Sequence, residues 1–72
     1  MTLSTAQAGK AYTIEQLDTN DEELNSFLFS LGCYSGEPIT VVSRRRRTMT
    51  VALKDSRYSI DSRLAQAITI AE

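Results

Sequence analysis

The sequence predicts a mainly β fold, in which five short strands form a small barrel and one α-helix follows the first strand. Three observations lead to this fold class. Apolar and polar residues alternate in several short runs, which is the pattern of half-buried strands. One stretch carries apolar residues at helical spacing instead. The chain has only 72 residues, so we expect a single domain over residues 1–72, and closure into a barrel would remove exposed sheet edges.

The alternating runs define five expected strands. They cover residues 10–16, 38–42, 48–53, 58–60 and 68–70. Residues 54–57 are expected to form the turn between the third and fourth strands. Asp61 or Ser62 is expected to cap a short helical turn through Gln66, just before the last strand.

The helix is expected between the first two strands. Its apolar stripe recurs at i, i+3, i+4 and i+7 and consists of Leu24, Phe27, Leu28 and Leu31. Thr19 or Asn20 is expected to be the N-cap, since each stands three residues before a glutamate. Gly32 is expected to end the helix, because glycine adopts the left-handed conformation without strain.

The composition excludes several classes of function. The chain has no histidine and one cysteine, so zinc sites built from His and Cys and catalytic Ser–His or Cys–His pairs are absent. No glycine-rich phosphate loop occurs, which argues against an enzyme acting on nucleotides. We expect a cytoplasmic protein, because neither a signal peptide nor a long apolar run is visible.

The charges are divided unevenly along the chain. Residues 1–36 carry one basic and five acidic groups, whereas residues 37–72 carry seven basic and four acidic groups. Four of the basic residues are consecutive: Arg44, Arg45, Arg46 and Arg47. This run is either a solvated hairpin end or a docking patch for an acidic protein surface. Nucleic acid is a weaker alternative, because no aromatic residue lies among the arginines to stack on bases.

Phe29 and Tyr34 are the other candidates for binding a partner. Phe29 lies about 140° around the helix from Leu24, outside the apolar stripe. Phe29 is either an ordinary aromatic residue, exposed or covered by the barrel, or an anchor for a protein partner. Tyr34 in the following turn is either a packing residue with a solvated hydroxyl or an extension of that surface.

Acidic residues gather before and within the first turn of the helix, at Asp18, Asp21, Glu22 and Glu23. Helix capping and the helix dipole account for these acids without a metal ion. Cys33 is interpreted as a small buried apolar residue, with a redox-sensitive thiol as the alternative. We therefore predict no metal site, no cofactor and no catalytic residue.

Three stretches of the chain resemble the FeoA family of small bacterial proteins. They are residues 3–14, 28–40 and 58–70. In the second stretch, Leu31-Gly32, Gly36 and Ile39 match the end of the family's helix, its turn glycine and its following strand.

The resemblance implies an SH3-like β-barrel and a non-enzymatic accessory role in ferrous iron uptake. It also implies that the partner is the cytosolic GTPase region of a FeoB-type membrane transporter. We expect no nucleic acid partner, no small-molecule substrate and no direct insertion into a membrane. Phe29, Tyr34 and Arg44 to Arg47 are then the expected contact residues. The alternative is an SH3-like regulatory module associated with a metal-responsive transcriptional repressor.

Overall fold

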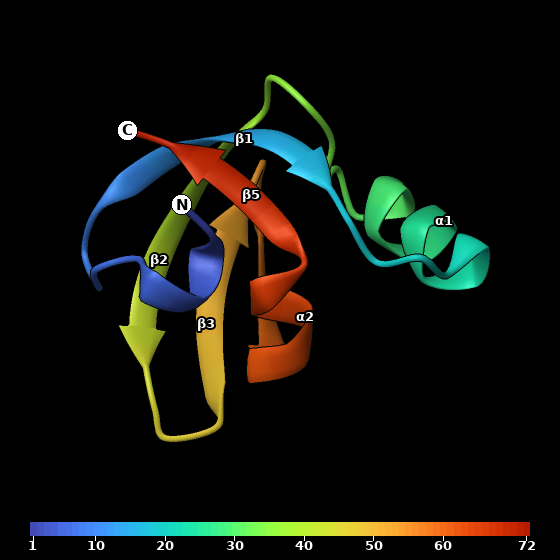
Figure 1. Cartoon of the computed structure of the whole chain (residues 1–72). Helices are drawn as coiled ribbons and strands as arrows, with labels where there is room; N and C mark the ends of the chain where they lie inside the picture. The colour runs from blue at the N-terminus through green and yellow to red at the C-terminus, as the bar shows by residue number, and fades with distance from the viewer.

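The computed structural model describes all residues, 1–72, and consists of a curved antiparallel sheet with two helices and a 3₁₀ turn (Figure 1). The strands are β1 (Ala11–Leu17), β2 (Pro38–Arg44), β3 (Thr48–Leu53), β4 (Ser56–Asp61) and β5 (Ile68–Ala71). The helices are α1 (Glu22–Ser30) and α2 (Ser62–Gln66), and the 3₁₀ turn η1 spans Leu3–Thr5. The predicted mainly β class, with a helix after the first strand and a helical turn before the last, is confirmed.

The strands pair in the order β4-β3-β2-β1-β5, and every pair is antiparallel. The register shifts in β1 between Ile14 and Gln16 and in β2 between Val41 and Ser43. Such irregularities bend a strand and increase its twist, so they help the sheet to curl. In Figure 1, β1 and β5 accordingly cross over the ends of β2 and β3.

The N-terminal residues cover the outer edge of β5. Thr2 forms an isolated antiparallel bridge with Thr69, and the Ile70 amide donates to the Met1 carbonyl at 2.9 Å. The first residues therefore satisfy backbone groups that an edge strand would otherwise expose.

The core follows the alternation seen in the sequence. In β3, for example, Met49, Val51 and Leu53 are buried, whereas the residues between them are half-buried. No charged side chain is buried, and apolar packing dominates the interior. None of the helices is long and apolar enough to cross a membrane.

The start of α1 differs from the prediction. Asp21 is the N-cap, and its carboxylate accepts hydrogen bonds from the amides of Glu23 at 3.0 Å and Leu24 at 3.2 Å. Asn20 has a φ of 58°, so it adopts the left-handed conformation rather than the extended one that an N-cap needs. The predicted caps Thr19 and Asn20 are therefore wrong.

The buried face of α1 is narrower than the predicted stripe. Only Leu28 is fully buried, and Phe27 has 55% of its surface exposed. Figure 1 shows why: α1 extends away from the barrel, so the barrel covers little of its surface. Phe27 belongs to the predicted apolar stripe but is mostly exposed. Periodicity identifies the apolar face of a helix but does not show how much of that face the rest of the protein covers.

Two helix boundaries agree with the prediction. Gly32, with a φ of 95°, ends α1, where its amide donates to the Phe29 carbonyl at 3.0 Å. Asp61 caps α2 by accepting from the Leu64 amide at 2.8 Å.

The turn between β3 and β4 is shorter than the predicted residues 54–57. β4 begins at Ser56, so this turn contains only Lys54 and Asp55.

Candidate protein-binding surfaces

The end of α1 brings Phe29 and Tyr34 together. Their ring centroids are 4.9 Å apart, and the ring planes are inclined by 39°. The chain reverses at Gly32 between them, which allows a helical residue and a turn residue to meet. Phe29 keeps 64% of its surface exposed, so the pair presents an aromatic face to solvent.

Lys54 lies against this pair from the β3–β4 turn. Its Nζ atom is 5.2 Å from the centroid of the Tyr34 ring and 3.4 Å from the Glu37 carboxylate. Tyr34, and to a smaller extent Glu37, raise the pKa of the Lys54 amine above its usual value, because both favour its charged form. A cation over the face of an aromatic ring is a favourable arrangement. Sequence reasoning missed Lys54, because nothing in its local sequence indicates the distant aromatic partner.

Gly32 also makes room for the Lys54 side chain. A Cβ atom at position 32 would lie 2.8 Å from the Cε atom of Lys54, which is closer than two carbon atoms pack. The lysine therefore passes directly over the glycine on its way to Tyr34 and Glu37. The glycine that ends the helix thus also helps to place a charge.

These side chains surround a shallow depression of about 440 Å³. Its larger lining residues are Phe29, Leu31, Tyr34, Leu53, Lys54 and Tyr58. We refer to Phe29, Tyr34, Lys54 and Tyr58 as the aromatic patch. It combines exposed aromatic surface with one cation, a combination typical of residues that anchor protein interfaces.

The arginine run divides into two parts. Arg44 donates to the carbonyl oxygens of Ala6 at 2.5 Å and Ser4 at 2.6 Å, so its guanidinium fastens β2 to the N-terminal turn. The remaining residues, Arg45–Arg47, form the β2–β3 loop, which we refer to as the arginine loop. All three are exposed and none pairs with a carboxylate, since the ion pairs of the structure are Lys10–Glu72 and Lys54–Glu37.

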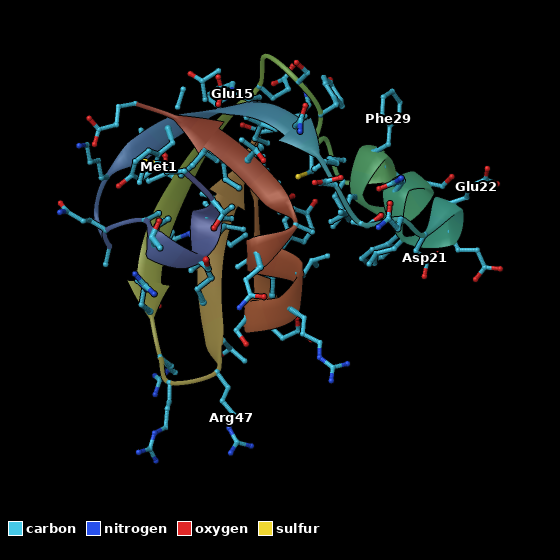
Figure 2. All side chains as sticks on the ribbon, in the orientation of Figure 1. Met1, Glu15, Asp21, Glu22, Phe29 and Arg47 are labelled. Carbon is cyan, nitrogen blue, oxygen red and sulfur yellow. The ribbon has the colours of Figure 1, made fainter.

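The aromatic patch and the arginine loop lie at different ends of the molecule. In Figure 2, Phe29 points outward from α1, whereas Arg47 points outward from the opposite end of the barrel. The structure thus brings Phe29 and Tyr34 together but keeps them apart from the arginines.

A wider hollow of about 590 Å³ lies between the base of α1 and α2, with Leu24 and Leu64 among its apolar residues. Two of its polar side chains are already engaged within the chain, because Asp61 caps α2 and Thr19 donates to Asn25 at 2.5 Å. We therefore place the main candidate surface at the aromatic patch, where the rings are exposed.

The residues of the chain do not fit a metal centre. No group of three His, Cys, Asp or Glu side chains comes together, and Asp21 is occupied as a helix cap. Cys33 is buried with 1% of its surface exposed, and this burial raises the pKa of its thiol to about 11. A thiol with so high a pKa stays protonated at neutral pH and is a poor metal ligand and nucleophile.

This architecture, a curled sheet of five antiparallel strands, is that of an SH3-like β-barrel domain. The FeoA domain model matches residues 1–72, and the chain belongs to the FeoA domain family. Membership in this family supports a role in ferrous iron transport. No curated protein sequence matches the chain.

Solved structures share the fold at low sequence identity. The FeoA of Stenotrophomonas maltophilia, complexed with zinc and described as a prokaryotic SH3 domain protein, has a TM-score of 0.87 at 19% identity, over 97% of this chain and 88% of that one. The FeoA protein of Chlorobium tepidum has a TM-score of 0.89 at 19% identity, over 99% and 69% of the two chains. A manganese-dependent transcriptional repressor also has a TM-score of 0.89, at 22% identity. The match covers 99% of this chain but only 40% of the repressor.

Proposed function

We propose that this protein is a cytoplasmic, non-enzymatic accessory protein of bacterial ferrous iron uptake that docks on the cytosolic GTPase region of a FeoB-type transporter. Family membership supports the iron-transport role, and the Stenotrophomonas relative has itself been suggested as a ferrous iron transport activating factor. The observation that carries the docking proposal is the aromatic patch at the end of α1. It presents an exposed Phe29 against Tyr34, with Lys54 beside them.

The patch specifies the chemistry of the surface that it binds. The depression accepts an apolar side chain of the partner, which would cover Phe29 and remove its exposed area from water. Lys54 lines the same depression, and it would add a carboxylate of the partner to its present pairing with Glu37. Buried aromatic anchors carry much of the binding energy of protein interfaces, so we expect Phe29 to dominate.

A titration of the GTPase region of the host's FeoB-type transporter, with and without guanine nucleotide, tests this proposal. We expect a dissociation constant on the order of micromolar, which is about −8 kcal/mol. Phe29→Ala should weaken binding by about 30-fold, the effect of a hot-spot residue worth about 2 kcal/mol. Phe27→Ala is the matched control, because Phe27 is also an exposed phenylalanine of α1 but does not line the depression.

Two results would contradict the proposal. Equal losses from the two phenylalanine variants would show that the aromatic patch is not the contact surface. Absence of binding, both to the GTPase region and to the intact transporter in detergent, would exclude docking itself.

A second candidate is a regulatory module that acts with a metal-responsive repressor. The observation that favours it is the fold shared with the manganese-dependent repressor. In that case the protein should bind the host's repressor, or retard its operator DNA in a gel with steep salt dependence. A neighbouring gene for a FeoB-type transporter would instead favour the first proposal.

A further inference from the structure

We propose that the arginine loop, Arg45–Arg47, binds the anionic headgroups of a lipid bilayer surface. This contact goes beyond docking on the transporter, and it needs no transporter to be observed. The first argument for this proposal is that the loop lies apart from the aromatic patch, so it can contact a different surface (Figure 2).

The charge of the loop is uncompensated. Three consecutive guanidinium groups are exposed and form no ion pair within the chain. Like charges so close together repel one another, and an anionic surface relieves that repulsion. Arginine is suited to this contact because its planar group donates several hydrogen bonds to phosphate oxygens.

The loop is held at its base. The Arg45 amide donates to the Thr48 carbonyl at 2.8 Å, and the Ser62 amide donates to the Arg47 carbonyl at 3.0 Å. Arg44 fastens the adjoining strand to the N-terminal turn. The three arginines therefore project from a restrained hairpin, and less conformational entropy is lost on binding than for a free tail.

The shape of the loop favours an extended surface over a single small anion. The basic side chains spread outward from the tip of the hairpin, Arg47 among them, rather than converging on one point (Figure 2). The depression beside the loop holds only about 40 Å³, too little to enclose a nucleotide. Nucleic acid is disfavoured as well, since Arg45–Arg47 include no aromatic side chain for base stacking.

The distribution of the remaining charge orients the molecule at such a surface. Asp21, the N-cap of α1, and Glu22, its first residue, lie away from Arg47 in Figure 2. An anionic bilayer attracts the loop and repels the start of α1. The loop therefore faces the headgroups, while the aromatic patch stays exposed to the aqueous side for a protein partner.

Flotation with lipid vesicles tests the proposal. We expect the full-length protein to float with vesicles of equal parts phosphatidylglycerol and phosphatidylcholine, and not with pure phosphatidylcholine. Raising the salt from about 0.05 M to about 0.5 M should release it, because the Debye length shortens about threefold. Arg46→Glu should lower the partition coefficient by at least about fivefold, the effect of one basic residue near an anionic surface.

Arg57→Glu is the matched control. This substitution makes the same change in net charge as Arg46→Glu. Arg57 is an exposed residue of β4 and lies opposite Ala52 in the β3–β4 pairing, near the other end of β3. The Arg57→Glu variant should therefore retain vesicle binding. Equal loss in the two variants, or equal flotation with neutral and anionic vesicles, would overturn the proposal. So would retention of an RNA or DNA oligonucleotide without vesicle binding. Phe29→Ala should not change flotation, which separates this test from that of transporter docking.

Discussion

The two ends of strand β3 carry cations in contrasting environments. At one end, Lys54 is restrained between Tyr34 and Glu37. At the other, Arg45–Arg47 extend into solvent without an acidic partner. A cation held in one position can form an ion pair of defined geometry with a partner. Unpaired cations instead attract any anionic surface over a longer range. One small barrel can therefore offer a specific contact and an electrostatic one without interference between them.

The largest effect that we predict concerns the buried thiol of Cys33, close to the aromatic patch. Cys33 follows Gly32, and its amide donates to the Leu28 carbonyl at 2.9 Å. Burial raises the pKa of this thiol from 9.0 to about 11 in the folded state. Below pH 9 the thiol is protonated in both states and has no effect. As the pH rises from 9 toward 11, the unfolded state ionises first, so the free energy of unfolding should fall by about 2 to 3 kcal/mol.

Urea unfolding at a series of alkaline pH values measures this fall. Cys33→Ala should make this fall clearly smaller, whereas Arg45→Ala should leave it unchanged. If the Cys33→Ala variant loses stability between pH 9 and pH 11 as steeply as the parent protein, the thiol is not the group that causes the fall.

A smaller effect is expected at the glycines on either side of Tyr34. Gly32 and Gly36 have φ values of 95° and 91°, so alanine at either position should cost about 1 to 2 kcal/mol of stability. Only at Gly32 would the new methyl group also collide with Lys54. Gly32→Ala should therefore weaken binding to the GTPase region more than Gly36→Ala does, at similar stability.

Unfolding curves and binding titrations of the two glycine variants give both quantities. NMR chemical shifts of the Tyr34 ring would report directly whether Lys54 has moved. Unchanged Tyr34 shifts in Gly32→Ala would show that the lysine reaches the ring by another path.

The smallest predicted effect separates Arg44 from the arginine loop. Arg44→Ala removes hydrogen bonds to the carbonyls of Ser4 and Ala6, which should cost about 1 kcal/mol. Arg45→Ala removes no such bond and should change stability by less than about 0.5 kcal/mol. Thermal or urea unfolding of the two variants makes the comparison. Equal stability would mean that Arg44 is also free to bind a partner.

Local patterns were sufficient to predict the barrel. Alternation predicted a strand over residues 48–53, and Gly32 marked the end of α1. Such features depend on near neighbours in the chain, so the sequence carries them directly. The exposure of Phe27 depends instead on how far α1 projects from the barrel. The spacing of apolar residues along the helix gives no information about that distance.

The candidate surfaces were predictable only in part. Phe29 and Tyr34 were selected from their places on the helix and in the turn, and they do lie in contact. The interactions of Lys54 with Tyr34, and of Arg44 with Ser4, join residues 20 and 40 positions apart. Only the folded topology brings these residues together, so the sequence alone did not distinguish Arg44 from its three neighbours.

The bridge between Thr2 and Thr69 has a consequence for modularity. It holds the two ends of the chain side by side, as Figure 1 also shows. A domain with adjacent ends can be appended to, or inserted into, a longer polypeptide while its own interior stays unchanged. This property accounts physically for the same barrel forming nearly the whole of one matching protein and 40% of another.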